Sequence, residues 1–192
     1  MKLNKWQQEN LPKAVIETAE DYGLMLPESK FDNDKDFWDC HGNWIIKHDA
    51  CEKIADIENI RFKPPTQNMD ISPNIALLIE GAIFKEGTNE AVKQDWSFGE
   101  ACARNTKMGY WWAMAEKRGK DRVILKLINA YEKGLYSETE ADDWNKMAQD
   151  KKDANKKETR SESGSETKSV STEGETANAT EAPTFDDDDI PF

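Results

Sequence analysis

Apolar positions recur along the chain at two spacings, which predict the order of its helices and strands. Residues 1–38 read as a helical lead-in, and residues 47–57 place apolar side chains along one face of a second helix. Alternating or largely apolar runs then predict three strands, over residues 60–63, 75–84 and 93–101. A turn around Gly87 joins the last two strands, so the three form an antiparallel meander.

The strongest amphipathic pattern follows these strands and predicts a long helix over residues 109–131. Val123 and Leu127 lie on its apolar face. Basic side chains recur at four-residue steps on the opposite face, at Arg118, Arg122 and Lys126. A shorter helix is expected over residues 138–147, with Ser137 as its N-cap. The order of elements predicts an α+β fold of helix, three-stranded meander and long basic helix.

Composition divides the chain into three parts. The helical lead-in of residues 1–38 precedes a core domain over residues 39–150. After residue 150, apolar side chains almost vanish, and Ser, Thr, Glu, Lys and Gly dominate. A segment of this composition cannot bury enough apolar surface to offset the entropy lost on folding. Residues 151–192 are therefore expected to form a disordered acidic tail.

Charge is unevenly distributed along the chain. The sequence holds 38 acidic and 26 basic residues, a formal net charge of −12, which argues against polyanion binding over the whole surface. Between residues 101 and 126, however, seven basic residues stand against two acidic ones, Glu116 and Asp121. Cations at four-residue steps on a helix match successive phosphates, and flanking aromatic rings stack on unpaired bases. The candidate nucleic-acid site is Arg104, Lys107, Trp111, Lys117, Arg118, Lys120, Arg122 and Lys126.

The same segment also has a simpler interpretation as an ordinary solvated helix face. Glu116 and Asp121 would then pair with its cations, and its tryptophans would lie in the core. Trp112 is expected in the core, whereas Trp111 fits either the core or a stacked base. A helical wheel does not separate the two interpretations.

Other chemistries find little support in the sequence. Cys40-His41 and His48-x-x-Cys51 offer ligand types for zinc, but closed zinc sites show tighter paired spacing. The sequence has no Gly-rich phosphate loop, nucleophile elbow or HExxH motif, so we predict neither an enzyme nor a bound metal or cofactor. Three cysteines and no apolar run of signal-peptide or membrane length predict a reduced, cytoplasmic protein.

The last seven residues form an acidic run that ends in an apolar tip with a free carboxylate. They are Asp186, Asp187, Asp188, Asp189, Ile190, Pro191 and Phe192. A solubilising tail needs the aspartates but has no use for the final Ile-Pro-Phe. These three residues predict docking into an apolar pocket of a partner protein, with cations around it. The tip resembles the C-terminal peptide of bacterial single-stranded-DNA-binding (SSB) proteins, which implies contact with host replication and repair proteins.

Four segments in the middle of the chain carry a second resemblance. They are residues 44–54, Phe62-x-Pro64-Pro65, residues 96–101 and residues 113–127. Together they resemble phage-encoded single-strand annealing proteins of the essential-recombination-function kind. The resemblance implies homo-oligomeric rings or filaments that hold single-stranded DNA in a basic groove and promote its pairing with a complement. It also implies a role in recombination in the cytoplasm of a bacterial host, without a nucleotide cofactor.

Two other functions stay open beside this leading hypothesis of a single-stranded-DNA-binding and annealing protein. A plain SSB-like protein would protect single strands without annealing them. Such a protein should be a five-stranded barrel, whereas three strands are predicted here. A non-DNA adaptor would use the tip to titrate the partners of SSB, and the basic segment would then be incidental.

Overall fold

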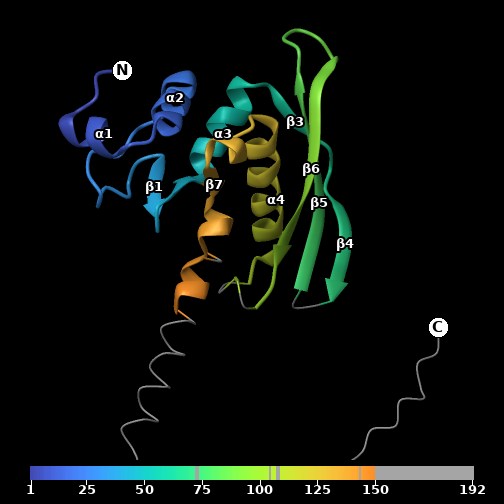
Figure 1. The fold of residues 1–192 in the computed structure, drawn as a ribbon. Helices are drawn as coiled ribbons and strands as arrows, with labels where there is room; N and C mark the ends of the chain where they lie inside the picture. Colours follow the sequence, from blue (N-terminus) through green and yellow to red (C-terminus); the bar gives the residue numbers. More distant parts are fainter. Residues whose placement is uncertain (72–73, 104, 107–108, 143, 150–192) are drawn as a thin grey trace, which may run out of the picture. The chain divides into compact units, whose positions relative to one another are not determined.

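A long strand, β5 (Asn74–Phe84), organises the larger sheet of the protein. On one side it pairs antiparallel with β6 (Ala91–Ala101) over nearly its whole length. On the other side it pairs, again antiparallel, with β3 (Ile60–Phe62) and β4 (Thr66–Ile71) in succession. The computed structural model (Figure 1) describes residues 1–71, 74–103, 105–106, 109–142 and 144–149.

The predicted antiparallel meander is confirmed, and β4 is added to it. Pro64 and Pro65 separate β3 from β4, because proline has no N–H donor and restricts the residue before it. The chain then resumes pairing along the same side of β5. The sequence of β4, Thr-Gln-Asn-Met-Asp-Ile, lacks the alternation of apolar and polar residues by which the other strands were recognised.

The inner face of this sheet is covered by α4 (Trp111–Leu127), which lies within the predicted long helix (Figure 1). Ile75, Leu77 and Ile79 of β5 are buried beneath it. Because residues two apart in a strand point to the same face, these alternate positions direct one side of β5 into the core.

Two glycines meet where α4 contacts the sheet. A Cβ atom on Gly99 of β6 would overlap the carbonyl oxygen of Ala115 and lie 2.6 Å from the backbone nitrogen of Gly119. A Cβ atom on Gly119 would in turn overlap Cγ1 of Ile79. Ala115, Gly119 and Val123 follow at four-residue steps, so they form one stripe of the helix. Small residues on this stripe set the distance between helix and sheet.

The helix α3 (His48–Ile57) packs against α4 on the side away from the sheet, at the residues predicted for the second helix. Its buried side chains include Ala50, Cys51 and Ile54. The long helix α4 therefore lies between the sheet and α3 (Figure 1). Both of these neighbours cover parts of its surface that a lone amphipathic helix would expose to water.

The N-terminal lead-in contains two short helices, α1 (Lys5–Asn10) and α2 (Lys13–Tyr22). A capping box begins α1, because the Gln7 backbone N–H donates to the Asn4 side chain and the Gln7 side chain accepts from the Asn4 N–H, both at 2.8 Å. Apolar residues from this region enter the main core at Leu11, Val15 and Ala19. The lead-in therefore shares one hydrophobic core with α3, α4 and the sheet.

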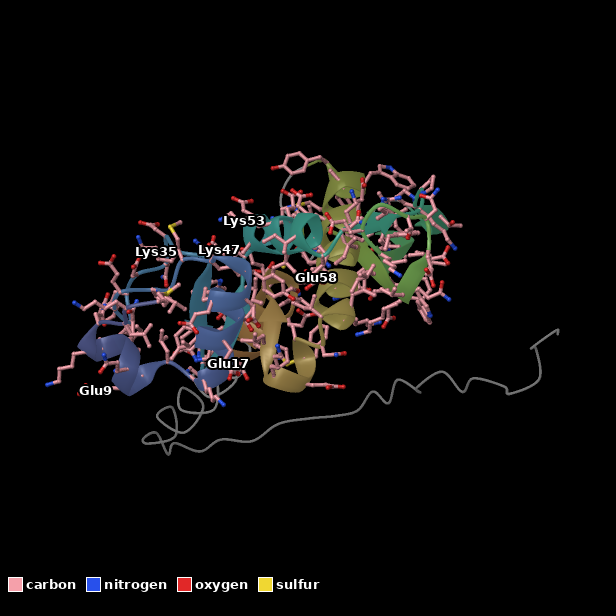
Figure 2. All side chains as sticks on the ribbon, turned by 90° about the horizontal axis from the view of Figure 1, so that it is seen from above. Glu9, Glu17, Lys35, Lys47, Lys53 and Glu58 are labelled. Carbon is pink, nitrogen blue, oxygen red and sulfur yellow. The ribbon has the colours of Figure 1, made fainter. Side chains whose placement is uncertain are left out.

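Polar contacts also fasten this region to α3. The Tyr22 hydroxyl donates to Glu58 Oε1 at 2.8 Å, and Lys53 Nζ pairs with the buried Asp36 carboxylate at 3.1 Å. Figure 2 shows Lys53 on α3 and Glu58 beyond its end. These contacts fix α3 between the N-terminal helices and α4.

A second, smaller sheet joins residues 37–46 to residues 135–137. β1 (Phe37–Cys40) and β2 (Asn43–Ile46) form an antiparallel hairpin, and β7 (Leu135–Ser137) pairs parallel with β2. The hairpin turn holds His41 and Gly42 at positive φ, a region that glycine enters without steric cost. The sequence did not predict this sheet, because its strands are short and β7 pairs with a strand about ninety residues earlier in the chain.

The chain continues from α4 through a short 3₁₀ turn, η1 (Tyr131–Lys133), to β7 and a further helical stretch over residues 138–142 and 144–149. The backbone N–H of Ser137 donates to Glu140 Oε2 at 2.9 Å, as expected where Ser137 is the predicted N-cap of this helix. The predicted tail, residues 151–192, lies outside the described residues. Among the described helices, none is long and apolar enough to cross a membrane.

Candidate nucleic-acid interface

Basic residues of α4 line the edge of β6. Three of them donate to the carbonyl oxygens of alternate strand residues: Arg118 Nη1 to Glu100 at 2.9 Å, Arg122 Nη1 to Phe98 at 2.8 Å and Lys126 Nζ to Trp96 at 2.7 Å. Four helical residues advance about 6 Å and two strand residues about 6.8 Å, so the two spacings match. The four-residue step that suggested successive phosphates thus also fits the carbonyl spacing of a strand edge.

Arg118 is buried, which corrects the expectation that it lies on an exposed face. It is 3% exposed, and its Nη2 donates to the carbonyl oxygen of Asn105 at 2.6 Å. Its Nη1 also contacts Thr106 Oγ1 at 3.3 Å, and the Asp142 carboxylate lies 3.8 Å from Nη2. The helical wheel failed here because α4 is flanked on both sides, so the face opposite its apolar stripe meets protein instead of solvent.

The other described cations of the predicted site are paired with carboxylates. Arg122 lies between Glu100, at 3.7 Å, and Glu140, at 3.2 Å. The remaining pairs are Lys117–Glu138 at 3.5 Å, Lys120–Glu116 at 2.7 Å and Lys126–Asp95 at 3.9 Å. Arg104 and Lys107 lie outside the described residues. The structure thus brings Arg118, Arg122 and Lys126 together along β6, but with their charge largely compensated.

The two tryptophans at the start of α4 depart from their expected places. Trp111, included in the predicted site, packs half-buried against the main core. Trp112, which was expected in the core, is 45% exposed. Neighbouring residues in a helix point about 100° apart, so a one-residue difference in register exchanges a buried and an exposed position.

Large side chains gather on the face of the larger sheet that points away from α4. We call this surface the outer face; it comprises Leu78, Glu80 and Ala82 of β5 and Gln94, Trp96 and Phe98 of β6. Trp96 is 53% and Phe98 38% exposed, and their ring centroids lie 5.5 Å apart at an interplanar angle of 78°. No helix of the described residues covers the outer face (Figure 1).

The distribution of side chains in β6 reverses the usual preference for burial. The inward positions, Ser97, Gly99 and Ala101, are small, whereas Trp96 and Phe98 between them point outward. The close approach of α4 explains the small inward residues, but nothing in the described core requires aromatic rings on the outside. This alternation of small and aromatic residues was a sequence signal for an exposed aromatic surface, and the helix-based interpretation did not use it.

A hollow of about 440 Å³ opens on the outer face beside these rings. Its lining comes from three strands and the residue after β3: Arg61, Phe62, Lys63, Glu80, Gly81, Ala82, Phe84, Gln94, Asp95 and Trp96. The Arg61 guanidinium lies 4.8 Å from the centroid of the Phe84 ring, and Lys63 Nζ lies 3.0 Å from Glu80 Oε1. The hollow therefore combines aromatic walls with cations, within the volume range of sites for small ligands.

The chemistry of the outer face favours flat, electron-rich groups. Exposed indole and phenyl rings stack on such groups, and cations beside an aromatic ring add an electrostatic attraction. The Lys126 ammonium lies 5.5 Å from the centroid of the Trp96 ring. At this distance it can also contact a group that stacks on the ring near the edge of β6. Unpaired nucleobases fit this description, and their stacking on aromatic side chains tolerates any base.

Apart from the outer face, a buried ionic pair joins α3 to α4. His48 Nδ1 lies 2.6 Å from Oδ1 of Asp121, which is 1% exposed, and His48 Nε2 lies 3.3 Å from Glu52. The hydrogen bond to Asp121 raises the pKa of His48, and burial raises the pKa of Asp121. Glu138 accepts the backbone N–H of His48 at 3.3 Å, and the nearby Lys117 ammonium opposes the rise in the His48 pKa.

The cysteines and histidines considered for zinc lie apart in the fold. Cys40 and Cys51 are buried in different clusters, and burial raises the pKa of both thiols. The part of the chain that the structure describes contains no group of three or more His, Cys, Asp or Glu side chains arranged to hold a metal ion.

Comparison of the chain with protein-family models, with curated proteins and with solved structures gave no match.

Proposed function

We propose that this protein binds single-stranded nucleic acid on the outer face of its larger sheet and promotes the annealing of complementary strands. The observation that supports this most directly is the exposed pair of aromatic rings, Trp96 and Phe98, beside a hollow lined by cations. Stacking on an aromatic side chain is worth about 1–3 kcal/mol per base, so two rings provide a useful part of an affinity.

The proposed interface differs from the basic groove that the sequence suggested. The α4 cations contribute at its border, where Lys126 approaches both Trp96 and the β6 edge. Arg61 and Lys63 line the end of the hollow that is separated from β6 by β5. A single strand that crosses the sheet would thus have its bases over the aromatic rings and its phosphates near these cations.

The remaining parts of the proposal come from the resemblances. The chain would act as a homo-oligomer in homologous recombination of a phage within a bacterial cytoplasm. It would use no nucleotide cofactor, and its tip at residues 186–192 would dock host proteins that otherwise bind SSB. A surface that stacks on unpaired bases suits annealing, because it binds each single strand before pairing. Once two strands have paired, their bases stack on one another and no longer stack on the protein.

The experiment compares a Trp96→Ala/Phe98→Ala variant with the wild-type protein in binding labelled oligonucleotides and in annealing complementary ones. We expect binding to weaken at least about tenfold, since each lost stacking contact removes about 1–3 kcal/mol. Trp112→Ala is the matched control, because Trp112 is also exposed but belongs to α4. Wild-type binding by a folded double variant would refute the proposed interface.

The same assay tests the separation between the body and the tail. A chain cut after residue 150 should anneal at the wild-type rate, because the outer face lies wholly before that residue. Loss of annealing on truncation would contradict this separation.

An adaptor that titrates the partners of SSB is the second candidate. The compensated charge of the α4 cations favours it, because the described part of the predicted basic groove offers little unpaired positive charge. If the wild-type protein binds no oligonucleotide but still binds a host protein through its tip, the adaptor function is correct.

A further inference from the structure

Carboxylates of the larger sheet already pair with cations that border the outer face. Lys63 lies 3.0 Å from Glu80, and Arg122 lies 3.7 Å from Glu100. Lys126 lies 3.9 Å from Asp95. Each pair joins a cation near the outer face to an acidic residue of β5 or β6, so the sheet carries its own competitors for phosphate.

Arg61 has different partners. Its guanidinium donates to the side-chain amide oxygens of Asn59, at 3.3 Å, and Asn89, at 3.1 Å, and lies over the Phe84 ring. Amide oxygens are neutral, so the positive charge of Arg61 is not cancelled by these contacts. Of the cations just described, Arg61 can meet a phosphate without first leaving a carboxylate.

We infer that Glu80 and Glu100 on the outer face, together with Asp95 beside Lys126, make this surface select unpaired bases and reject duplex; this specificity rests on the proposed function. A phosphate that approaches Lys63, Arg122 or Lys126 must replace a carboxylate, which then remains beside it and repels it. The net electrostatic gain per phosphate is therefore small. Stacking on Trp96 and Phe98 does not involve these ion pairs, so it becomes the main source of affinity.

Duplex cannot use that source. Its bases are stacked on one another, and its surface presents one negative charge per about 1.7 Å of helix axis. It would meet Glu80 and Glu100 on the outer face and Asp95 beside Lys126, and it would gain no stacking in return. For an annealing protein the consequence is release of the product, because the surface loses its hold as the bases pair.

The experiment replaces the three carboxylates by amides, in the variant Glu80→Gln/Asp95→Asn/Glu100→Gln. Asparagine at 95 keeps the side-chain oxygen that accepts the Trp96 N–H. Glu9→Gln/Glu17→Gln/Glu28→Gln is the matched control, with the same change of charge and two broken surface pairs. Figure 2 shows Glu9 and Glu17 on the N-terminal helices, away from the sheet.

Binding of a single-stranded oligonucleotide and of a hairpin duplex is measured between about 50 and 200 mM salt. The wild-type protein should bind the single strand with a shallow salt dependence and bind the duplex much more weakly. In the carboxylate variant, Lys63 and Lys126 lose their carboxylates, whereas Arg122 keeps Glu140 at 3.2 Å. Two phosphate contacts therefore become available, and each adds about 0.7 to the slope of log K against log salt for a single strand. We expect the slope to steepen by about 1.4 and the duplex affinity to rise at least tenfold, with slower release of annealed product.

The outcomes separate the two proposals. If the wild-type protein binds neither form, the proposed function fails, and the specificity fails with it. If the wild-type protein binds single strands but the carboxylate variant gains no more duplex affinity than the control, the specificity is wrong and the proposed function stands. Should the triple variant unfold, Glu80→Gln alone provides the same comparison, with a slope change of about 0.7.

Discussion

Replacing Gly119 by alanine tests the close packing of α4 on the sheet, which positions the whole interface. In most helix interiors this substitution stabilises a protein by about 1 kcal/mol, because glycine loses more backbone entropy on folding. At Gly119 the new methyl group would overlap Cγ1 of Ile79 and lie 3.2 Å from the backbone nitrogen of Gly99. We therefore expect the sign of the effect to reverse.

The magnitude follows from what must move. Overpacking a core by one methyl group costs about 1–3 kcal/mol, so after the gain in helix propensity we expect Gly119→Ala to lower the free energy of unfolding by about 1 kcal/mol. Gly99→Ala should cost more, about 3 kcal/mol, because its methyl group meets the backbone of α4 at Ala115 and Gly119. Backbone atoms cannot rotate away, so the helix itself must shift.

Urea unfolding followed by far-UV circular dichroism gives the required free energies. Gly109→Ala is the control, because a Cβ atom there would meet nothing within 4 Å. A displaced α4 would also pull Arg122 and Lys126 from the carbonyl oxygens of β6. A Gly119→Ala protein as stable as the wild type, or more stable, would contradict this close packing, since α4 would then lie farther from the sheet.

Two further predictions concern buried charges. Arg118→Met should lower the free energy of unfolding by about 3 kcal/mol, measured in urea, because it leaves the carbonyl oxygens of Glu100 and Asn105 without a donor; an unchanged stability would contradict its structural role. His48→Gln should destabilise most in acid: the raised pKa means that protonated His48 contributes its full stability below its ordinary pKa of 6.5, and this is lost as pH rises through the raised value. A difference in unfolding free energy between wild type and His48→Gln that does not change with pH would contradict the pairing with Asp121.

Strong periodicity allowed much of the fold to be predicted. The strands β3, β5 and β6 and the helices α3 and α4 carry apolar side chains at spacings of 2 or 3.6 residues, and all were recognised. β4 was missed because its pairing depends on the backbone of β5 and not on a pattern of its own. The small sheet was missed because β7 finds β2 across about ninety residues, a pairing that local sequence does not encode.

The candidate site was harder to predict, because its residues change meaning with their neighbours. A helical wheel records which side of a helix is apolar, but it contains no strand edge whose carbonyl oxygens need donors. Arg118, Arg122 and Lys126 looked like ligands for phosphates, and in the fold they donate to β6. Trp96 and Phe98 lie within the predicted strand of residues 93–101, and their exposure depends on α4 covering the opposite side of the sheet.

The α4 cations along the β6 edge also constrain how copies of this chain can assemble. Among the described strands, β6 pairs with β5 alone, and an open edge of this kind invites another strand. A strand added there would have to displace the charge-assisted hydrogen bonds that Arg118, Arg122 and Lys126 donate to β6. Each of these is stronger than the backbone hydrogen bond that would replace it. A homo-oligomer should therefore form through surfaces other than the β6 edge. Assembly by strand addition at the β6 edge would therefore not compete with a nucleic-acid strand on the adjoining outer face.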